Sequence, residues 1–394
     1  MDLVYTLTAY PPSVGGAQIH QHFLAQELKS RHSIQVISHW DTNRSDWLLG
    51  TTLKAPSKGR DYIRDDISIH RLGFSLWDKL KLGFCLPIYY PLMELALPII
   101  SNVLTPKLSS FTSKANLIHN IRIGREGLSY ASLRLARRYD IPFVFTPAHH
   151  PRWVGWRYRI YIELYRQADA VIALTNTEKK TLVKLGVQEE RIHVTGIGPV
   201  LANQSNGEAF KERSGICEPI ILFLGQHYTY KGFQQVLKAA PFVWQRIPEA
   251  NFVFIGPPVK RSEQYFSSVA DPRIYRLGQV GLQEKTDALA ACTLLCVPSS
   301  QESFGGVYTE AWMLGKPVIG CHIPAVAEVI TEGVDGYLVA QQPEKVAERI
   351  CYLLENPLKA QAMGEAGKQK VNSQYTWRQL ATKTEAVYRS IVSG

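Results

Sequence analysis

Cysteine is scarce in this sequence, and nothing indicates a disulfide framework. Six of the 394 residues are cysteine, and no two of them form a C-x-x-C pair. Cys292 and Cys296 stand in an apolar run, which is typical of buried, reduced thiols. The sequence therefore predicts a protein of a reducing compartment. Low-complexity disorder is also excluded, because 45% of the residues are hydrophobic and 20% are charged.

Metal-ligand patterns are missing as well. The chain has no D-x-D motif, a spacing that can bring two carboxylates to one metal ion. Two close histidine pairs occur, His20 with His22 and His149 with His150. Neither pair has the i, i+4 spacing that places two ligands on one helix face, and no cysteine is near them. We therefore expect no metal ion and no separate cofactor.

A secretion signal is not expected, because the N-terminus lacks a basic region and a cleavage site. One run, Leu82 to Leu104, is long enough to span a bilayer, and Glu94 is its only charge. Pro87, Pro91 and Pro98 interrupt it, and a central charge costs about 3 kcal/mol on insertion scales. Three interpretations stay open: a buried helix pair, a segment resting on a membrane surface, and a spanning helix.

Positive charge is concentrated in the first half of the chain. The net charge is +10, and residues 1–199 carry 25 basic and 16 acidic side chains. This asymmetry indicates an anionic partner, such as nucleotide phosphates, a phospholipid surface or nucleic acid, unless the surface is merely basic. Aromatic and basic residues also alternate from Arg152 to Arg159. That run suits a sugar-acceptor groove or a membrane, core packing, or a single nucleic-acid strand.

Apolar strands and helical patterns alternate along the chain, and the rhythm restarts after the polar stretch Ala202–Gly215. Expected strands are 3–8, 34–38, 117–119, 143–146 and 170–174, then 220–224, 251–255, 294–297, 317–320 and 337–339. Expected helices are 17–30, 128–139, 158–167 and 177–185, then 233–243, 283–291, 307–314, 325–329 and 343–356.

Alternating strands and helices predict parallel sheets with helices on both faces. We expect an α/β fold of two doubly wound, Rossmann-like domains that face each other across a cleft. Ligands of such sheets bind at the carboxyl ends of the strands. The expected N-terminal domain comprises residues 1–200 and the C-terminal domain residues 201–374, and residues 375–394 form a final helix.

The most informative segment runs from Gln301 to Ala311, where a predicted buried strand gives way to a helix. Gly305 and Gly306 leave backbone N–H groups uncovered at the start of that helix, where the helix dipole favours an anion. Glu302 in the loop and Glu310 in the helix flank this cradle, and carboxylates there can accept hydrogen bonds from a ribose or hexose. The alternative is that Glu302 caps the helix and Glu310 faces solvent.

Two other glycine-bearing loops follow predicted strands. Lys231 stands next to Gly232, where a lysine can neutralise a phosphate, although a surface lysine is the commoner case. Gly15 and Gly16 follow the first strand and let the backbone approach a phosphate. This loop is not a G-x-G-x-x-G motif, and no acidic residue closes the second strand, so a dinucleotide site is not expected.

Together these motifs resemble GT-B fold glycosyltransferases of the retaining family 4 type. The resemblance covers about residues 3–390 and rests on Glu302 and Glu310 around Phe304-Gly305, Gly225 with Lys231-Gly232, Gly15-Gly16, Thr146 with His149-His150, and Tyr375-Thr376-Trp377. The motif of two carboxylates around Phe-Gly is specific to the superfamily and identifies neither donor nor acceptor.

The resemblance implies an acceptor-binding N-terminal domain, a nucleotide-sugar-binding C-terminal domain, and a final helix that packs back on the N-terminal domain. It also implies roles for single residues. Lys231 would contact the donor diphosphate, Glu310 the nucleotide ribose and Glu302 the hydroxyls of the donor sugar. His119 or His150 would reach the sugar from the N-terminal domain. The other residues expected to bind the donor are Gly15, Gly16, Gly225, Gln226, Gln279, Val280, Ser303, Phe304, Gly305, Gly306 and Val307.

One position departs from the family pattern. The family usually has arginine directly after the glycine of the Lys231 loop, and here Gln226 follows Gly225. A neutral amide thus replaces a permanent cation at the leaving group. Either Lys231 or a cation from the basic N-terminal domain compensates, or turnover is slower, or the enzyme is impaired.

The implied activity is retaining, metal-independent transfer of a hexose from a nucleotide sugar, with UDP-glucose as the expected donor. The expected acceptor is lipid-linked or a polysaccharide precursor, in the cytoplasm at the inner face of the plasma membrane. Peripheral membrane contact through the basic N-terminal domain is expected, and a nucleic-acid partner is not. The alternatives are a soluble synthase of a disaccharide or its phosphate, and a catalytically silent scaffold that binds a nucleotide sugar.

Overall fold

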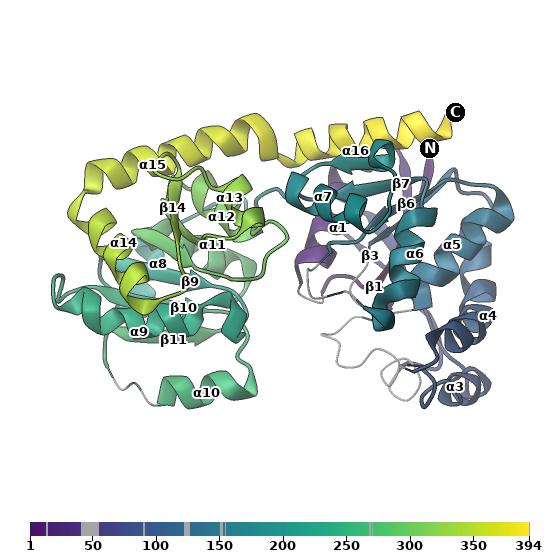
Figure 1. Ribbon diagram of the computed structural model, residues 1–394, viewed down its shortest axis with the longest axis horizontal. Coiled ribbons are helices and arrows are strands. Elements are labelled where there is room, and N and C mark those ends of the chain that lie inside the picture. The colour runs from purple at the N-terminus through teal and green to yellow at the C-terminus, as the bar shows by residue number, and fades with distance from the viewer. Residues whose placement is uncertain are drawn as a thin grey trace. The chain divides into compact units, whose positions relative to one another are not determined.

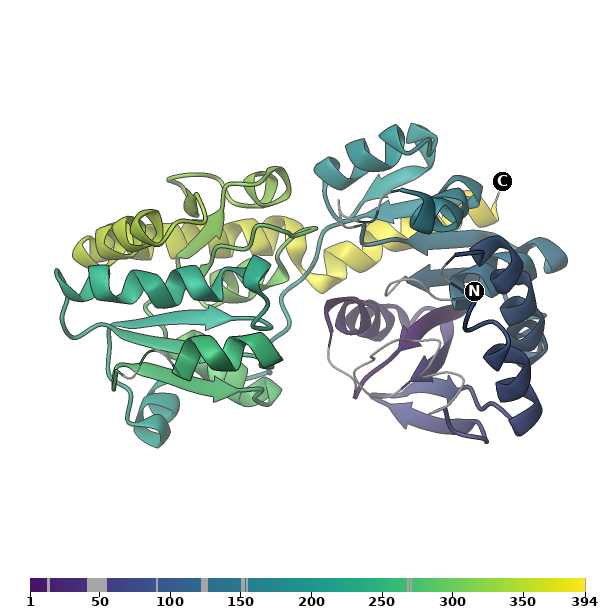
Figure 2. The same ribbon diagram turned by 60° about the horizontal axis from the view of Figure 1, so that its bottom comes forward.

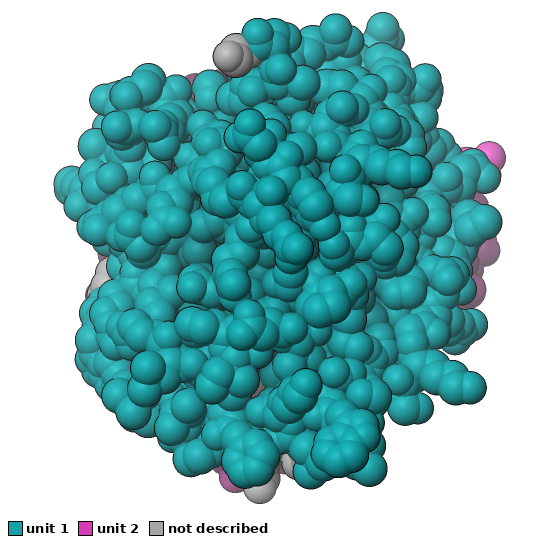
Figure 3. Space-filling model, turned by 90° about the vertical axis from the view of Figure 1, so that its right-hand side faces the viewer, with its two compact units in different colours: residues 1–196, 377–394 teal, residues 197–376 magenta. Residues whose placement is uncertain are grey.

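The computed structural model describes residues 1–12, 15–40, 55–89, 91–121, 127–149, 153, 155–267, 269 and 271–393. It divides into two compact units, which Figure 3 colours separately. Unit 1 comprises Met1–Gly196 together with Trp377–Gly394, and unit 2 comprises Ile197–Thr376. Each unit contains one sheet with helices on both faces (Figures 1 and 2).

The sheet of unit 1 has eight strands in the order β3-β4-β2-β1-β5-β6-β7-β8. The strands are β1 Asp2–Ala9, β2 Ser33–Trp40, β3 Arg60–Arg64, β4 Ile67–Arg71, β5 Leu117–Ile121, β6 Phe143–Thr146, β7 Ala170–Ala173 and β8 Ile192–Val194. All neighbours run parallel except β3 and β4. The central strands are buried along nearly their whole length, because helices cover both faces of a parallel sheet.

The helices of unit 1 form two apolar cores, one on each side of the sheet. They are α1 Gly16–Leu28, α3 Leu76–Gly83, α4 Met93–Thr112, α5 Gly127–Tyr139, α6 Arg159–Gln167, α7 Asn176–Lys184 and α16 Trp377–Val392, with short turns η2 Trp156–Tyr158 and η3 Glu189–Arg191. The last helix, α16, joins the core that contains α1, where the rings of Phe23 and Trp377 stack with centroids 5.2 Å apart.

The apolar run from Leu82 to Leu104 is divided between two helices. It begins at the end of α3, passes through a turn and continues into α4, which contains Pro98. Within the described ranges, no helix combines the length and apolarity needed to cross a bilayer. One side of α4, including Leu97, is buried in the core of unit 1, whereas the opposite side is exposed.

The sheet of unit 2 has six parallel strands in the order β11-β10-β9-β12-β13-β14. The strands are β9 Ile220–Leu224, β10 Asn251–Ile255, β11 Ile274–Gly278, β12 Leu294–Val297, β13 Val318–Cys321 and β14 Gly336–Val339. The helices are α8 Gly207–Ser214, α9 Phe233–Trp244, α10 Lys260–Ser267, α11 Leu282–Ala291, α12 Gly306–Met313, α13 Pro324–Val329, α14 Pro343–Glu355 and α15 Pro357–Lys370, with turns η4 Thr229–Lys231 and η5 Val371–Tyr375.

These two sheets confirm the expected pair of doubly wound, Rossmann-like units. In unit 2 the strand order reverses between β9 and β12, because β10 and β11 extend the sheet to one side and β13 and β14 to the other. In open α/β sheets a ligand binds outside the carboxyl ends of the strands at such a reversal. The loops after β9 and β12 are therefore the expected position of the site.

Candidate active site

Lys231 and Glu302 meet at the reversal point of the unit 2 sheet. Lys231 ends η4 in the loop after β9, and Glu302 lies in the loop after β12. The Nζ of Lys231 lies 2.5 Å from Oε1 of Glu302. Their side chains are 23% and 10% exposed, so solvent screens this ion pair only in part. The fold thus brings together two residues that stand 71 positions apart in the sequence.

Hydrogen bonds to backbone carbonyls, from one backbone N–H and one side chain, tie these two loops together. The Ser300 N–H donates to the Tyr230 carbonyl at 2.8 Å. The Gln341 amide, in the segment after β14, donates to the carbonyls of Tyr230 at 3.0 Å and Pro298 at 2.8 Å. Gly232 has a φ of +85°, and a Cβ there would lie 2.5 Å from the Pro298 oxygen. Any larger residue would therefore force the loops apart.

The N-terminus of α12 completes this corner. Gly305 precedes the helix with a φ of +89°, and a Cβ there would lie 2.3 Å from the Tyr308 ring. Phe304 is buried and contacts the edge of the Tyr375 ring, with centroids 5.2 Å apart. The first N–H groups of a helix have no acceptor within the helix, so the turn from Ser303 to Val307 presents donors suited to an anion.

Glu310 lies further along α12 and is buried, at 7% exposed. Its Oε2 lies 2.9 Å from the Nζ of Lys285 on α11, and Lys285 also donates to the Val200 carbonyl at 2.6 Å. Burial raises the pKa of Glu310, and the positive charge of Lys285 opposes that rise. The alternative of a solvent-facing Glu310 is therefore wrong.

The other predicted residues of unit 2 follow neighbouring strands. Gly225 follows β9 and donates its N–H to the Ile255 carbonyl at 2.9 Å. Gln226 is exposed, and its carbonyl accepts the Tyr228 N–H at 2.7 Å. Gln279 and Val280 come directly after β11. Because these strands run parallel, all four residues lie at the same edge of the sheet as Lys231.

His227 stands directly after Gln226 and belongs to no motif in the sequence. It is fully buried between aromatic rings. Its ring stacks on Phe233, with centroids 5.5 Å apart, and is tilted against Phe266, with centroids 5.3 Å apart. Within the described residues neither ring nitrogen has a hydrogen-bond partner. Burial therefore lowers the pKa of His227 to about 4, so this imidazole is neutral near pH 7.

In unit 1, Gly15 and Gly16 lie where the loop after β1 becomes α1. Gly15 is the residue before the helix, and its carbonyl accepts the Ile19 N–H at 3.1 Å. A Cβ at Gly16 would meet no atom within 4 Å. The strand order of unit 1 reverses between β1 and β5, so this helix start also lies at a reversal point.

His119 lies on β5 inside the core of unit 1, at 1% exposed. Its Nδ1 lies 2.6 Å from the Tyr388 hydroxyl and its Nε2 lies 2.8 Å from Oγ1 of Thr146. Burial lowers the pKa of His119 to about 3. Both ring nitrogens are thus used within unit 1, and we assign His119 no part in the chemistry. His150, the other expected histidine, lies outside the described residues.

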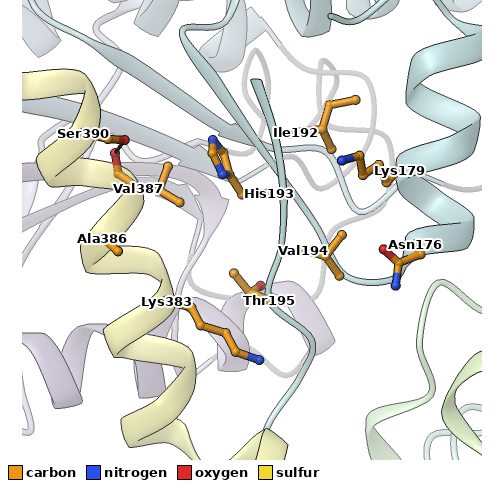
Figure 4. A pocket seen from close by; sticks show the side chains of 10 residues that line it. All are labelled: Asn176, Lys179, Ile192, His193, Val194, Thr195, Lys383, Ala386, Val387 and Ser390. Carbon is orange, nitrogen blue, oxygen red and sulfur yellow. Dashed lines mark hydrogen bonds between the residues drawn. The ribbon is translucent and has the colours of Figure 1, made fainter. Parts of the chain in front are cut away.

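A cavity of about 600 Å³ in unit 1 is separate from these residues. Figure 4 shows it between α7, β8 and α16, with Lys179 and Lys383 on opposite sides. None of its ten lining residues belongs to the set predicted from the sequence. Across the described ranges, no group of three or more histidine, cysteine, aspartate or glutamate side chains is arranged to hold a metal ion.

Two family models match the chain. One, described as a glycosyl transferase 4-like domain, matches residues 15–198, and the other, described as glycosyl transferases group 1, matches residues 218–356. Among curated proteins, glycogen synthase of Mycobacterium tuberculosis is 25% identical over 285 residues, which are 68% of this chain and 67% of that protein. D-inositol 3-phosphate glycosyltransferase 1 of Catenulispora acidiphila is 28% identical over 254 residues, 58% of each chain.

Solved structures show the same fold. Anabaena HepE, in complex with UDP-glucose, has a TM-score of 0.76 and 17% identity, with all of both chains covered. Sucrose-phosphate synthase from Thermosynechococcus elongatus has a TM-score of 0.75 and 17% identity, with 100% of this chain and 99% of that chain covered. Two Rossmann-like sheets, a carboxylate–glycine loop at a reversal point and both family models lead to one conclusion. The chain belongs to the group 1, GT4-like glycosyltransferases of the GT-B fold, which take their sugar from a nucleotide-sugar donor.

Proposed function

We propose that this protein is a retaining transferase that moves glucose from UDP-glucose to a lipid-linked or polysaccharide-precursor acceptor, without a metal ion. The acceptor is presented at the inner face of the plasma membrane. The observation that carries the proposal is the Lys231–Glu302 ion pair, which lies at the strand-order reversal beside the start of α12. The choice of UDP-glucose is supported by HepE, whose structure was solved with that donor.

The leaving diphosphate gains negative charge as the sugar departs, and fixed positive groups lower the energy of that state. An ammonium has three protons, so Lys231 retains two for phosphate oxygens while it donates one to Glu302. The N–H groups at the start of α12 supply further donors beside Gly305. Attack on the same face as the leaving phosphate, which takes up the acceptor proton, gives retention.

The two carboxylates divide the hydroxyl groups of the donor between them. Glu302 uses Oε1 for Lys231, which leaves Oε2 as the acceptor for hydroxyls of the sugar. Glu310 takes the ribose hydroxyls from a buried position. Burial raises the pKa of Glu310, and the positive charge of Lys285 beside it opposes that rise.

Gln226 makes Lys231 the main cation in this part of the donor site. The residue after Gly225 is exposed and uncharged, so the site has one permanent cation fewer than the family pattern supplies. If the alternative of a silent scaffold holds, the protein binds the nucleotide sugar without cleaving it. If a soluble disaccharide synthase is the answer, a free sugar or sugar phosphate replaces the lipid-linked acceptor.

Thermal-shift measurements against UDP, GDP and ADP and their sugar conjugates test the donor. We expect UDP-glucose to stabilise the protein equally with and without EDTA, and a ligand at 100 times its Kd adds about 2.7 kcal/mol. A shift with GDP or ADP compounds alone would overturn the donor assignment, and a shift that EDTA abolishes would overturn metal independence.

Donor cleavage separates the enzyme from the silent scaffold. We expect the wild type to release glucose slowly from UDP-glucose in the absence of acceptor, and Glu302→Ala to abolish that release. Binding of UDP-glucose with no release and no transfer would favour the scaffold. Transfer to glucose or fructose 6-phosphate, with none to lipid-linked sugars, would favour the soluble synthase.

A further inference from the structure

An apolar patch covers α3 and the start of α4 in unit 1, which we name the α3–α4 patch. Leu76, Trp77 and Phe84 are 72%, 74% and 79% exposed. The patch continues through four further exposed side chains, Leu80, Leu92, Leu95 and Ile99. Both helices lie side by side at one end of unit 1 (Figure 1). Monomeric proteins rarely expose this many large apolar side chains together unless the surface binds something.

The orientation of α3 reverses the usual pattern of a surface helix. Leu76, Leu80 and Phe84 are four residues apart, so they share one face, and Trp77 stands seven residues before Phe84 on the same side. A surface helix normally turns its apolar face to the core. Here that face points outward, and Leu82 is the only buried residue of α3. With eight residues, α3 is far too short to span a bilayer.

Charge at the patch favours an anionic surface. The two carboxylates next to it are already neutralised, since Asp78 pairs with Lys107 at 2.9 Å and Glu94 pairs with Arg159. Lys79 and Lys81, in contrast, have no ion-pair partner among the described residues, and Lys81 is exposed. The exposed apolar side chains are therefore accompanied by free positive charge.

A second aromatic group adjoins the patch. The Arg159 guanidinium lies over the Trp156 ring, 5.2 Å from its centroid, while it also pairs with Glu94 at the start of α4. Trp156 is 51% exposed. This indole thus extends the patch toward α6. Tryptophan suits the boundary between lipid headgroups and acyl chains, because its ring is apolar and its N–H is polar.

We propose that the α3–α4 patch docks unit 1 on a bilayer that contains anionic phospholipid. Trp77 and Phe84 enter the boundary between headgroups and acyl chains, and Lys79 and Lys81 contact lipid phosphates. The proposal shares with the proposed function only the membrane location of the acceptor. The two lysines carry unpaired positive charge, whereas the carboxylates near them are already neutralised. That charge matches anionic lipid phosphates better than it matches a protein partner or a second copy of the chain.

Flotation of the full chain with vesicles tests this proposal. We expect the wild type to rise with phosphatidylcholine vesicles that contain phosphatidylglycerol, and much less with phosphatidylcholine alone. Leu76→Ser combined with Phe84→Ser removes two exposed apolar groups and lowers the floated fraction by at least about tenfold. Leu358→Ser is the matched control, because Leu358 is 81% exposed on α15 of unit 2, and it floats like the wild type.

The charge contribution has its own pair of variants. Lys79→Glu with Lys81→Glu is expected to abolish the preference for phosphatidylglycerol, and Lys238→Glu, an exposed position on α9, is expected to keep it. No flotation of the wild type with either vesicle, or equal flotation of the serine double variant, would overturn the proposal. A wild-type dimer that the serine substitutions dissociate would instead identify an interface between copies.

Failure of this proposal is distinguishable from failure of the proposed function. The serine double variant lies in unit 1, outside the donor-binding loops of unit 2, so its thermal shift with UDP-glucose should match that of the wild type. Loss of flotation with a normal shift supports the docking surface. A wild type that floats but shows no shift refutes the donor and leaves the docking surface in place.

Discussion

The Lys231 side chain is held in place by Glu302, its neighbour in the candidate site. Its Nζ is 2.5 Å from Glu302, in a loop fixed against the Pro298 carbonyl by Gly232. A lysine on a free loop loses side-chain entropy when it binds a phosphate. Here the Glu302 carboxylate has already restricted that freedom. If Lys231 binds the donor diphosphate as proposed, the ion pair orients this cation before the diphosphate arrives.

Replacing Lys231 by alanine tests this role. Removal of one such contact at a developing anion typically costs about 2.7–4 kcal/mol of barrier, so we expect kcat to fall by roughly 10²–10³. Steady-state kinetics with UDP-glucose gives the measurement, and Lys238→Ala is the control on an exposed site of unit 2. A loss of less than about fivefold would remove Lys231 from the mechanism.

His227 makes a second residue-level prediction, concerning pH. Its pKa is about 4 in the folded protein and 6.5 in a free chain, so the unfolded state binds more protons between these values. Stability from this residue is therefore present above about pH 6.5 and is lost as the pH falls toward 4. Between about pH 7 and pH 5 the loss amounts to about 2 kcal/mol.

His227→Phe should reduce that loss, because phenylalanine fits among the surrounding rings and does not titrate. Chemical unfolding at about pH 7 and pH 5 measures the free energy of unfolding of the variant and the wild type. The dependence should shrink without vanishing, since burial also lowers the pKa of His20 to about 4 and of His119 to about 3. Equal pH dependence in the variant and the wild type would show that His227 does not carry this energy.

At the scale of elements, the strands and helices that the sequence predicts are those that bury apolar side chains. The strands 143–146, 220–224, 251–255 and 294–297 match β6, β9, β10 and β12 residue for residue. These strands are buried on both faces and appear as short continuous apolar runs. Helices such as α9 and α14 differ from expectation by one residue at an end.

Elements with a different kind of packing escaped this reasoning. The antiparallel hairpin of β3 and β4 turns at Asp65 and Asp66 and has a largely exposed, polar outer strand. Helix α15 buries mainly small residues, with Met363 as its one large buried side chain, and Gly364 lies against the Gly315 backbone and Gly367 against the Trp312 ring. Such a face leaves no hydrophobic period in the sequence.

In the candidate site, too, some residues are predicted from the local sequence and others are brought in only by the fold. Motif spacing selected Lys231, Glu302 and Glu310 as candidates, since their neighbours in the sequence are distinctive. Lys285 and Gln341 were missed, because each acts on a residue or loop that only folding brings near: Glu310 for the first, Tyr230 and Pro298 for the second. His119 was chosen by resemblance, and its pairing with Tyr388, 269 residues away, was not visible in the sequence.

At the scale of the whole molecule, α16 ties the end of the described chain to the start. Trp377 stacks on Phe23, Tyr388 reaches His119 and lies 3.1 Å from the Tyr5 hydroxyl, and Glu385 lies 3.1 Å from His32. The apolar core beside α1 includes Ala381, Val387 and Tyr388. Unit 1 is therefore incomplete without a segment that follows all of unit 2.

Shortening the chain before Tyr375 should destabilise unit 1 specifically. Tyr388→Phe is a milder test, because it leaves the buried Nδ1 of His119 without its hydroxyl partner, at a cost of about 1–3 kcal/mol. Calorimetry measures both, and Tyr352→Phe on α14 of unit 2 is the control. If the melting of unit 1 is the same in the shortened chain, α16 does not stabilise it.

This arrangement also sets the order in which the protein can be completed during its synthesis. The ribosome makes most of unit 1 first, then the whole of unit 2, and only then α16. At typical rates of synthesis, unit 2 occupies roughly 10 to 40 seconds. Throughout that interval, the surface of unit 1 that α16 covers has no partner. Unit 2 is therefore the first unit able to finish folding, although it is made second, and an early stop in translation damages the part of the protein that was made first.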